Sequence, residues 1–211
     1  HQFNKQVAED YLDKNFNWNS AIIAESGELL DSLGYKWWKK QEPDMENVKV
    51  EAIDLLHFVI SDYLQKNYND NKFYIIRTID EFRMSFLDKG FNLSFSLEQQ
   101  VNQLNLNSIG RFTIMKQIFN HLNMSNDDVY IAYIVKNCLN KFRQNNGYKD
   151  GTYIKYWNGK EDNVIAYEIA NEWGADEELF EHLYIDLETY YNENVLKVKK
   201  DSILDKIDFF N

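Results

Sequence analysis

The sequence predicts an all-α protein, built as a bundle of helices. Proline, the residue that most strongly breaks a helix, occurs once in 211 residues, as Pro43. Glycine, the next strongest helix breaker, occurs only eight times. Apolar residues recur at spacings of three and four along most of the chain, which is the period of an amphipathic helix. Strands are therefore expected to be few or absent.

Polar and turn-forming residues divide this pattern into helical segments with short connections. We expect helices over residues 2–14, 18–33, 46–66, 73–88, 109–122, 125–144, 161–173 and 176–194, with a further tail to 209. The stretch 67–108 is expected to form a satellite helical lobe of one domain that spans 1–211. Residues 145–160 hold three glycines and four aromatic residues without a helical period, which indicates a long ordered loop.

Charge and cysteine content exclude several classes of protein. A net charge of −11 argues against nonspecific binding to nucleic acid, which requires a basic face. Cys138 is the only cysteine, so an intramolecular disulfide and a cysteine-based zinc site are excluded, and a reducing, cytoplasmic compartment fits. The longest apolar run, in LLHFVI, has about six residues, whereas a bilayer span needs about 20. No membrane partner is therefore expected.

Two predicted helices carry acidic residues among their apolar ones. In AIIAESGELLDS, Glu25 and Glu28 are three residues apart. At about 100° per residue, with Glu25 at zero, Leu29 falls near +40° and Glu28 near −60°, so both acids are expected on the buried stripe. NVKVEAIDLLHF repeats the arrangement with Glu51 and Asp54. The short connection at Pro43 makes the two helices antiparallel neighbours, so that their acids can face each other.

Acid pairs of this spacing most often lie on a solvated face, which is the ordinary alternative. Four buried carboxylates, however, need cations to neutralise them. Donor sets made only of oxygen suit Mg²⁺, or Mn²⁺ in its place, better than zinc. We therefore expect Mg²⁺ at a site made by four acids, which are Glu25, Glu28, Glu51 and Asp54. Asp31 continues the spacing but falls about −120° from Glu25, off the stripe.

A di-iron centre is a second interpretation, because Asp54 and His57 form half of the acid-x-x-His pattern of di-iron bundles. That pattern needs two copies. Neither His121 nor His182 has an acid three positions before it. His57 is therefore expected to be a hydrogen-bonded residue of the core or behind the metal ligands.

A third helix carries cationic and amide side chains on one face. Lys136, Asn140 and Arg143 are spaced i, i+4 and i+7, within about 60° of one another. A solvated basic ridge is the ordinary interpretation of such a trio. Beside a metal cluster, the same trio suits a polyphosphate ester. The loop 145–160 is then expected to close over the ligand, or else to be a static loop anchored by its aromatic residues, Tyr153, Tyr156 and Trp157.

Three segments resemble the dimeric all-α dUTPases, within the all-α NTP pyrophosphohydrolase superfamily. They are ESGELLDS with the following YKWWKK, VKVEAIDLLHF, and FRQNNGYKDGTYIKYWNGKEDN. The first two give the superfamily's E-x-x-E and E-x-x-D metal motif, and the third is specific to the dimeric dUTPases. Together they cover residues 21–58 and 136–163, with weaker support at 1–18, whereas 60–125 contributes little. The resemblance implies a bundle with a four-helix metal-binding core and additional helices in a smaller lobe.

The resemblance also implies a role for each site residue. The four acids become Mg²⁺ ligands, and Glu25 also orients the attacking water. Contacts to phosphate and sugar are implied for Lys136, Asn140, Arg143, Tyr148 and Lys155. Trp38 matches the tryptophan that lines the uracil pocket, with a core aromatic as the alternative. Asn4 matches an amide residue near the base; the family has a glutamine three residues earlier, where this chain has His1.

The implied reaction is hydrolysis of dUTP, and of dUDP, to dUMP with release of pyrophosphate or phosphate, by a homodimer. It keeps uracil out of DNA and supplies dUMP. Two other functions remain open on the residues: a related nucleotide pyrophosphohydrolase with another base preference, and a catalytically silent helical binding protein.

Overall fold

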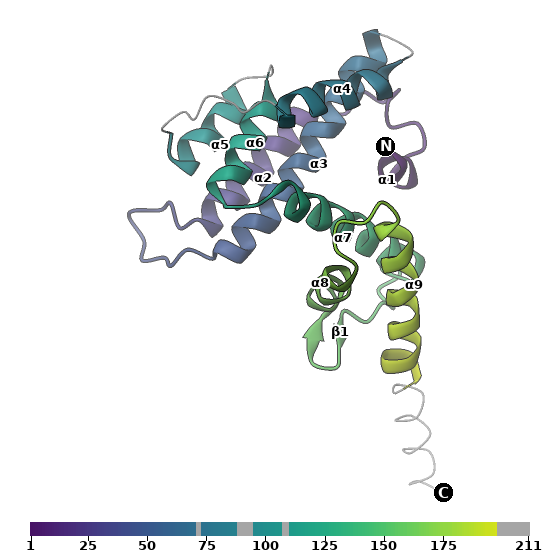
Figure 1. Ribbon diagram of the computed structural model, residues 1–211. Coiled ribbons are helices and arrows are strands. Elements are labelled where there is room, and N and C mark those ends of the chain that lie inside the picture. The colour runs from purple at the N-terminus through teal and green to yellow at the C-terminus, as the bar shows by residue number, and fades with distance from the viewer. Residues whose placement is uncertain (71–72, 88–94, 107–109, 198–211) are drawn as a thin grey trace, which may run out of the picture. The chain divides into compact units, whose positions relative to one another are not determined.

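The structure is a computed structural model that describes residues 1–70, 73–87, 95–106 and 110–197 (Figure 1). It consists of two compact units, His1–Ser125 and Asn126–Asn211, and each is described by itself. The expected helical tail to 209 lies outside the described residues beyond 197. No helix in the described ranges is both long enough and apolar enough to cross a membrane. The expected cytoplasmic location stays a prediction.

The first unit is helical in every described element. Its helices are α1 (Gln2–Val7), α2 (Trp18–Ser32), α3 (Met45–Asp70), α4 (Tyr74–Leu87), α5 (Leu97–Leu106) and α6 (Arg111–His121). The long helix α3 packs against α2, α4 and α6, and α5 packs against α2 and α6. The mostly helical fold predicted from the sequence is confirmed.

Apolar residues at helical spacing hold α2 and α3 together. Ile22 and Leu29 of α2, and Val48, Ala52 and Leu55 of α3, have no exposed surface. Full burial of a leucine or isoleucine side chain contributes about 1.5–3 kcal/mol, so this seam is a main source of the unit's stability. The seam follows the spacing of three and four that predicted both helices.

The connection between α2 and α3 is closed at its base. The backbone N–H of Asp44 donates to the carbonyl of Ser32 at 2.8 Å, so the end of α2 meets the start of α3. The carboxylate of Asp44 then accepts the backbone N–H of Asn47 at 3.0 Å, which caps the first turn of α3. Both contacts support the antiparallel pairing expected from the short connection at Pro43.

A buried ion pair fixes α6 in the first unit. The guanidinium of Arg111 is almost fully buried and donates through Nη1 to Asp62 of α3 at 2.8 Å. Its Nε donates to the carbonyl of Leu104, at 3.1 Å, and its Nη2 to Asn19 of α2. Arg111 therefore joins α6 to α2, α3 and the end of α5.

The expected helix over 2–14 is wrong beyond Val7. Residues 9–15 form turns, and the N–H of Tyr11 donates to the carbonyl of Ala8 at 3.1 Å. These turns place Tyr11 and Leu12 in a small buried cluster with Leu64 of α3. Tertiary packing therefore outweighs the local helical pattern here.

In its described residues, the second unit has three α-helices and one short π-helix around an aromatic core. Its described elements are α7 (Asn126–Asn145), β1 (Tyr156–Trp157), β2 (Lys160–Glu161), α8 (Asp162–Trp173), α9 (Leu179–Tyr191) and the π-helix η1 (Asn192–Leu196). Trp157 is fully buried, and its indole N–H donates to the carbonyl of Ile154 at 2.8 Å. It lies near Phe142 of α7 and Tyr191 of α9, with ring centroids 5.7 and 5.1 Å away.

The strands β1 and β2 are two residues long each and pair as an antiparallel hairpin. Its turn residues, Asn158 and Gly159, both have positive φ, at 49° and 81°. Asn-Gly is the usual pair for a turn with two left-handed residues. The expectation of few strands is confirmed for the described residues.

Candidate functional site

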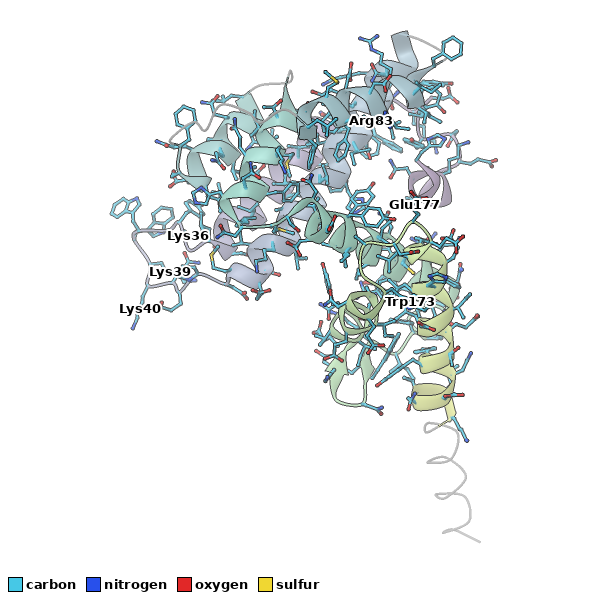
Figure 2. The ribbon with its side chains drawn as sticks, viewed as in Figure 1. Lys36, Lys39, Lys40, Arg83, Trp173 and Glu177 are labelled. Carbon is cyan, nitrogen blue, oxygen red and sulfur yellow. The ribbon has the colours of Figure 1, made fainter. Side chains whose placement is uncertain are left out.

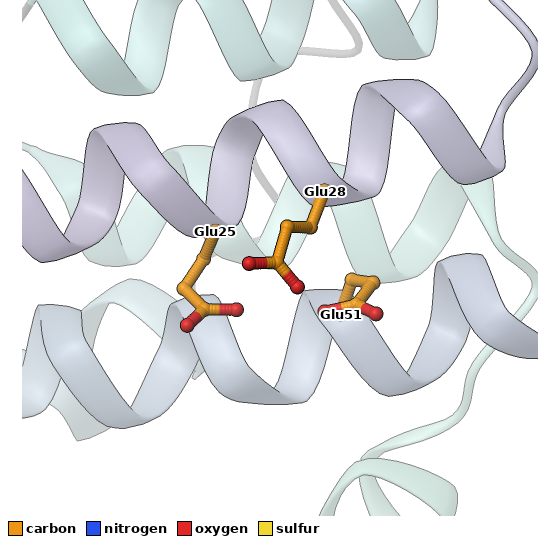
Figure 3. Close-up of side chains that lie close together, drawn as sticks. All are labelled: Glu25, Glu28 and Glu51. Atoms are coloured by element: carbon orange, nitrogen blue, oxygen red, sulfur yellow. The ribbon is translucent and has the colours of Figure 1, made fainter.

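Three carboxylates gather where α2 faces α3 (Figure 3). Glu25 and Glu28 come from α2, and Glu51 comes from α3. Each offers one oxygen, and these oxygens all lie within 4.8 Å of one another. Three negative charges at this separation repel one another unless a cation lies among them. Oxygen donors at this spacing fit Mg²⁺, which needs few protein ligands because it keeps several waters.

Asp54 is the fourth acid expected at this site. It lies on α3 three residues after Glu51 and is partly buried. It does not belong to the close group formed by the other three. The structure therefore brings together three of the four predicted ligands. His57 is partly buried on the same helix, and no histidine joins the group among the described residues, so nothing there favours a di-iron site.

The expectation that the acids are buried is wrong. Glu28 is exposed, and Glu25, Glu51 and Asp54 are only partly buried. The buried residues of α2 are Ile22, Ser26 and Leu29, near +60°, +100° and +40° from Glu25 at about 100° per residue. The buried stripe therefore has Glu25 at its edge and Glu28 outside it. The case for a cation rests on how close the three acids lie, not on their burial.

Asn47 supports the cluster from the first turn of α3, and the sequence reasoning did not identify it. Its Nδ2 donates to Oε1 of Glu51 at 3.1 Å and to Oγ of Ser32 at 2.8 Å. The amide therefore orients Glu51 and links it to the end of α2. Its spacing could have predicted this contact, since Asn47 lies four residues before Glu51 and residues four apart share a helix face.

Asp31 has a structural role instead of a place in the cluster. It forms an ion pair with Lys36 and accepts a hydrogen bond from Gln41 at 3.1 Å. These hydrogen bonds, first from Lys36 and then from Gln41, lower the pKa of Asp31. The acid thus holds the loop between α2 and α3, which also carries the exposed residues Lys39 and Lys40 (Figure 2).

The two predicted base contacts lie in the first unit. Trp38 is 61% exposed and meets Tyr35 edge to face, with ring centroids 5.9 Å apart. The alternative of a core aromatic is therefore wrong for Trp38. Asn4 of α1 donates through Nδ2 to the hydroxyl of Ser61 on α3 at 2.8 Å. This contact fixes the amide against α3.

The predicted phosphate contacts lie in the second unit. Lys136 and Asn140 are partly exposed on α7. Arg143 makes a bidentate ion pair with Asp162, through Nε and Nη2, both at 2.7 Å. Asp162 has no exposed surface. Arg143 is therefore not simply part of a solvated basic ridge.

The loop after α7 is anchored at two of the three aromatic residues expected to do so. Trp157 is buried, and Tyr153 stacks on Tyr191 with ring centroids 5.5 Å apart. Tyr148 and Tyr156 are 55% and 61% exposed. Lys155 is exposed and pairs with Glu161 at 3.2 Å. Closure of the loop over a ligand stays a prediction.

Residues 1–148 match the family model described as dUTPase. The chain belongs to the dUTPase family. The resemblance drawn from the three sequence segments is therefore confirmed. The family match takes in most of the predicted site: Asn4, Glu25, Glu28, Trp38, Glu51, Asp54, Lys136, Asn140, Arg143 and Tyr148. Lys155 lies beyond it. A direct comparison with curated proteins gave no match.

Proposed function

We propose that this member of the dUTPase family is a Mg²⁺-dependent dUTP diphosphatase, which also accepts dUDP and releases dUMP. The observation that carries the proposal is the meeting of Glu25, Glu28 and Glu51 within 4.8 Å in a chain of this family. The dUMP produced supplies thymidylate synthesis, and removal of dUTP keeps uracil out of DNA.

The four acids predicted as ligands are proposed to bind the metal and to activate the attacking water. Glu25, Glu28, Glu51 and Asp54 hold Mg²⁺, which when bound polarises phosphoryl oxygens and lowers the pKa of water. Glu25 orients the attacking water and accepts its proton. No covalent intermediate is required.

Substrate binding falls to other parts of the chain. Lys136, Arg143 and Lys155 donate to phosphate oxygens and stabilise the charge that develops on the leaving group. Asn140 and Tyr148 contact the sugar and phosphate. Trp38 stacks on the base, which an exposed aromatic ring can do, and Asn4 lies at its edge.

Two rival functions give different results in one experiment. Pyrophosphate release is measured for dUTP, dCTP, dTTP and dATP, with and without Mg²⁺. The proposal requires turnover of dUTP well above the other three, and only with the metal. A preference for dCTP or dTTP would identify a related pyrophosphohydrolase. No turnover of any nucleotide would identify a catalytically silent binding protein.

The enzyme is proposed to act as a homodimer, in line with the dimeric family that it resembles. Analytical ultracentrifugation tests this separately from the chemistry. A species of twice the 25.2 kDa chain mass is expected at micromolar concentration. A monomer at every concentration would reject the dimer and leave the reaction untouched.

A further inference from the structure

Asp162, the first residue of α8, is the centre of a saturated hydrogen-bond network in the second unit. Its Oδ2 accepts from Nε of Arg143 and from the hydroxyl of Tyr153, both at 2.7 Å. Its Oδ1 accepts from Nη2 of Arg143 at 2.7 Å and from the backbone N–H of Asn163 at 2.8 Å. Four donors therefore converge on a carboxylate that has no exposed surface.

The network joins three separate segments. Arg143 comes from the last turn of α7, Tyr153 from the loop that follows, and Asp162 from the start of α8. Burial, and then the hydrogen bond to Asp162, raises the pKa of Tyr153, so its hydroxyl stays protonated and remains a donor. Tyr153 also stacks on Tyr191 of α9, which fixes its ring.

The ion pair leaves one end of the guanidinium available. Nε and Nη2 of Arg143 both point to Asp162, and no hydrogen bond joins Nη1 to another residue of the described chain. The side chain of Arg143 keeps 17% of its surface exposed. A planar guanidinium held at two nitrogens cannot rotate, so the direction of its third nitrogen is fixed.

We propose that Asp162 is a positioning residue, which holds Arg143 so that Nη1 is presented to a phosphate of the nucleotide. The inference rests on the proposed function, in which Arg143 contacts phosphate. Tyr153 supports Asp162 by donating to the same oxygen as Nε of Arg143. Preorganisation of this kind improves binding because the arginine does not have to be ordered when the ligand arrives. The benefit applies only to ligands that carry phosphate.

Two variants test the role, and they differ in severity. Asp162→Asn removes the charge that pairs with Arg143. Tyr153→Phe removes one hydrogen bond and retains the stacked ring. Glu168→Gln is the control, since Glu168 lies on the same helix and forms an exposed pair with Lys160 at 2.6 Å.

The readout is calorimetric affinity for two ligands: a dUTP analogue with nitrogen between its α and β phosphorus atoms, with Mg²⁺, and deoxyuridine, which has no phosphate. Asp162→Asn is expected to weaken binding of the analogue about tenfold, and Tyr153→Phe about threefold. Affinity for deoxyuridine should not change in either variant. The control should match wild type for both ligands.

A double variant tests whether Asp162 acts through Arg143. When Arg143→Ala is already present, adding Asp162→Asn should weaken analogue binding no further, because the residue to be positioned is gone. A further tenfold loss would overturn the inference. So would wild-type analogue affinity in both single variants, or an equal loss for deoxyuridine, which would indicate a purely structural role.

The outcomes also separate this inference from the proposed function. If Asp162→Asn does not fold, Tyr153→Phe decides the question alone. If wild type hydrolyses dUTP but the variants bind the analogue normally, only the positioning role fails. If wild type neither binds the analogue nor hydrolyses dUTP, the proposed function fails and the inference fails with it.

Discussion

Asn47 donates a hydrogen bond of 3.1 Å to Oε1 of Glu51, one turn further along α3. Groups that orient a metal ligand typically change metal affinity by about 10–100-fold when removed. We therefore predict that Asn47→Ala weakens Mg²⁺ binding about tenfold, as measured by titration of the metal against thermal stability. Asn102→Ala, an exposed asparagine on α5, is the control. Unchanged Mg²⁺ affinity in Asn47→Ala would show that Glu51 needs no such support.

Glu25→Gln is expected to keep the fold and abolish most dUTP turnover. The substitution conserves volume but removes one ligand charge and the carboxylate proposed to accept a proton from water. Loss of a general base typically lowers the rate by about 10²–10⁴-fold. The measurements are single-turnover pyrophosphate release and circular dichroism. A variant that retains its turnover would transfer the base role to another acid.

Mg²⁺ is expected to raise the melting temperature of the wild type, because it relieves repulsion among Glu25, Glu28 and Glu51. At a free metal concentration 100 times the Kd, the gain in unfolding free energy is about 2.7 kcal/mol. The gain should shrink in Glu25→Gln. It should persist in Asp31→Asn, because Asp31 pairs with Lys36 instead. A wild-type melting temperature that does not respond to Mg²⁺ would argue against a preorganised cluster.

The pairing of α2 with α3 could be predicted from sequence, because both helices carry a continuous apolar seam at Ile22, Leu29, Val48 and Leu55. The exposure of Glu28 could not be predicted from the sequence, because it depends on where α5 packs. The hydroxyl of Ser26 donates to Asn105 of α5 at 3.1 Å, so α5 covers the side of α2 that faces away from Glu28.

The helix α5 itself lies in the stretch 67–108, where no separate helix was expected at its position. It has buried residues at helical spacing, which are Leu97, Gln100, Val101 and Leu104. The sequence of this helix, LEQQVNQLNL, also holds three glutamines and two asparagines, which weaken the apolar pattern. Because the position of α5 was not predicted, the sequence could not show which side of α2 is buried, and so could not show that Glu28 is exposed.

The role of Asp162 could not be predicted from the sequence either. An acid at the start of a helix is normally explained by the helix dipole and the free N–H groups there. Its ion pair with Arg143 joins residues 19 positions apart across a loop of irregular structure. Local patterns carry no information on such a contact, so only the folded unit reveals it.

Cys138 is expected to be unreactive in the folded protein at pH 8. Burial raises the pKa of its thiol to about 12, from an ordinary value of 9.0. Because the thiolate is the nucleophile, alkylation by iodoacetamide should be at least about 100-fold slower in the native than in the denatured chain. Rapid alkylation of the native protein would show that α7 opens readily around this residue.

The same shift predicts a pH dependence of stability. Between pH 9 and about 12 the folded thiol keeps a proton that the unfolded thiol loses. The contribution of Cys138 to the free energy of unfolding is therefore fully present below pH 9 and declines as the pH rises. The slope from this group is at most about 1.4 kcal/mol per pH unit. Chemical denaturation at pH 8 and pH 10 should therefore show a smaller decrease in Cys138→Ala than in wild type. An identical decrease in both would contradict the shift.

Gly147 ends α7 in a way that other residues should not tolerate. Its φ is +87°, and the N–H of Tyr148 donates to the carbonyl of Arg143 at 3.0 Å, as in a Schellman cap. A Cβ at Gly147 would lie 2.0 Å from Oγ1 of Thr152, whereas a Cβ at Gly151, at φ +69°, would meet nothing within 4 Å. Gly151→Ala should therefore destabilise by about 1 kcal/mol, the usual penalty for a left-handed residue, and Gly147→Ala by more.

A third substitution separates the two causes at Gly147. Thr152→Ala removes the clashing hydroxyl, so Gly147→Ala should be less destabilising in that background and approach the effect of Gly151→Ala. The comparison is made by thermal unfolding of the wild type and of four variants, which are Gly147→Ala, Gly151→Ala, Thr152→Ala and the double variant Gly147→Ala/Thr152→Ala. Since the cap also fixes Tyr148 directly after the turn that carries Arg143, Gly147→Ala should weaken binding of the nonhydrolysable dUTP analogue as well. Equal destabilisation by Gly147→Ala and Gly151→Ala would show that the hydroxyl of Thr152 rotates away freely, and that only the backbone conformation limits this position.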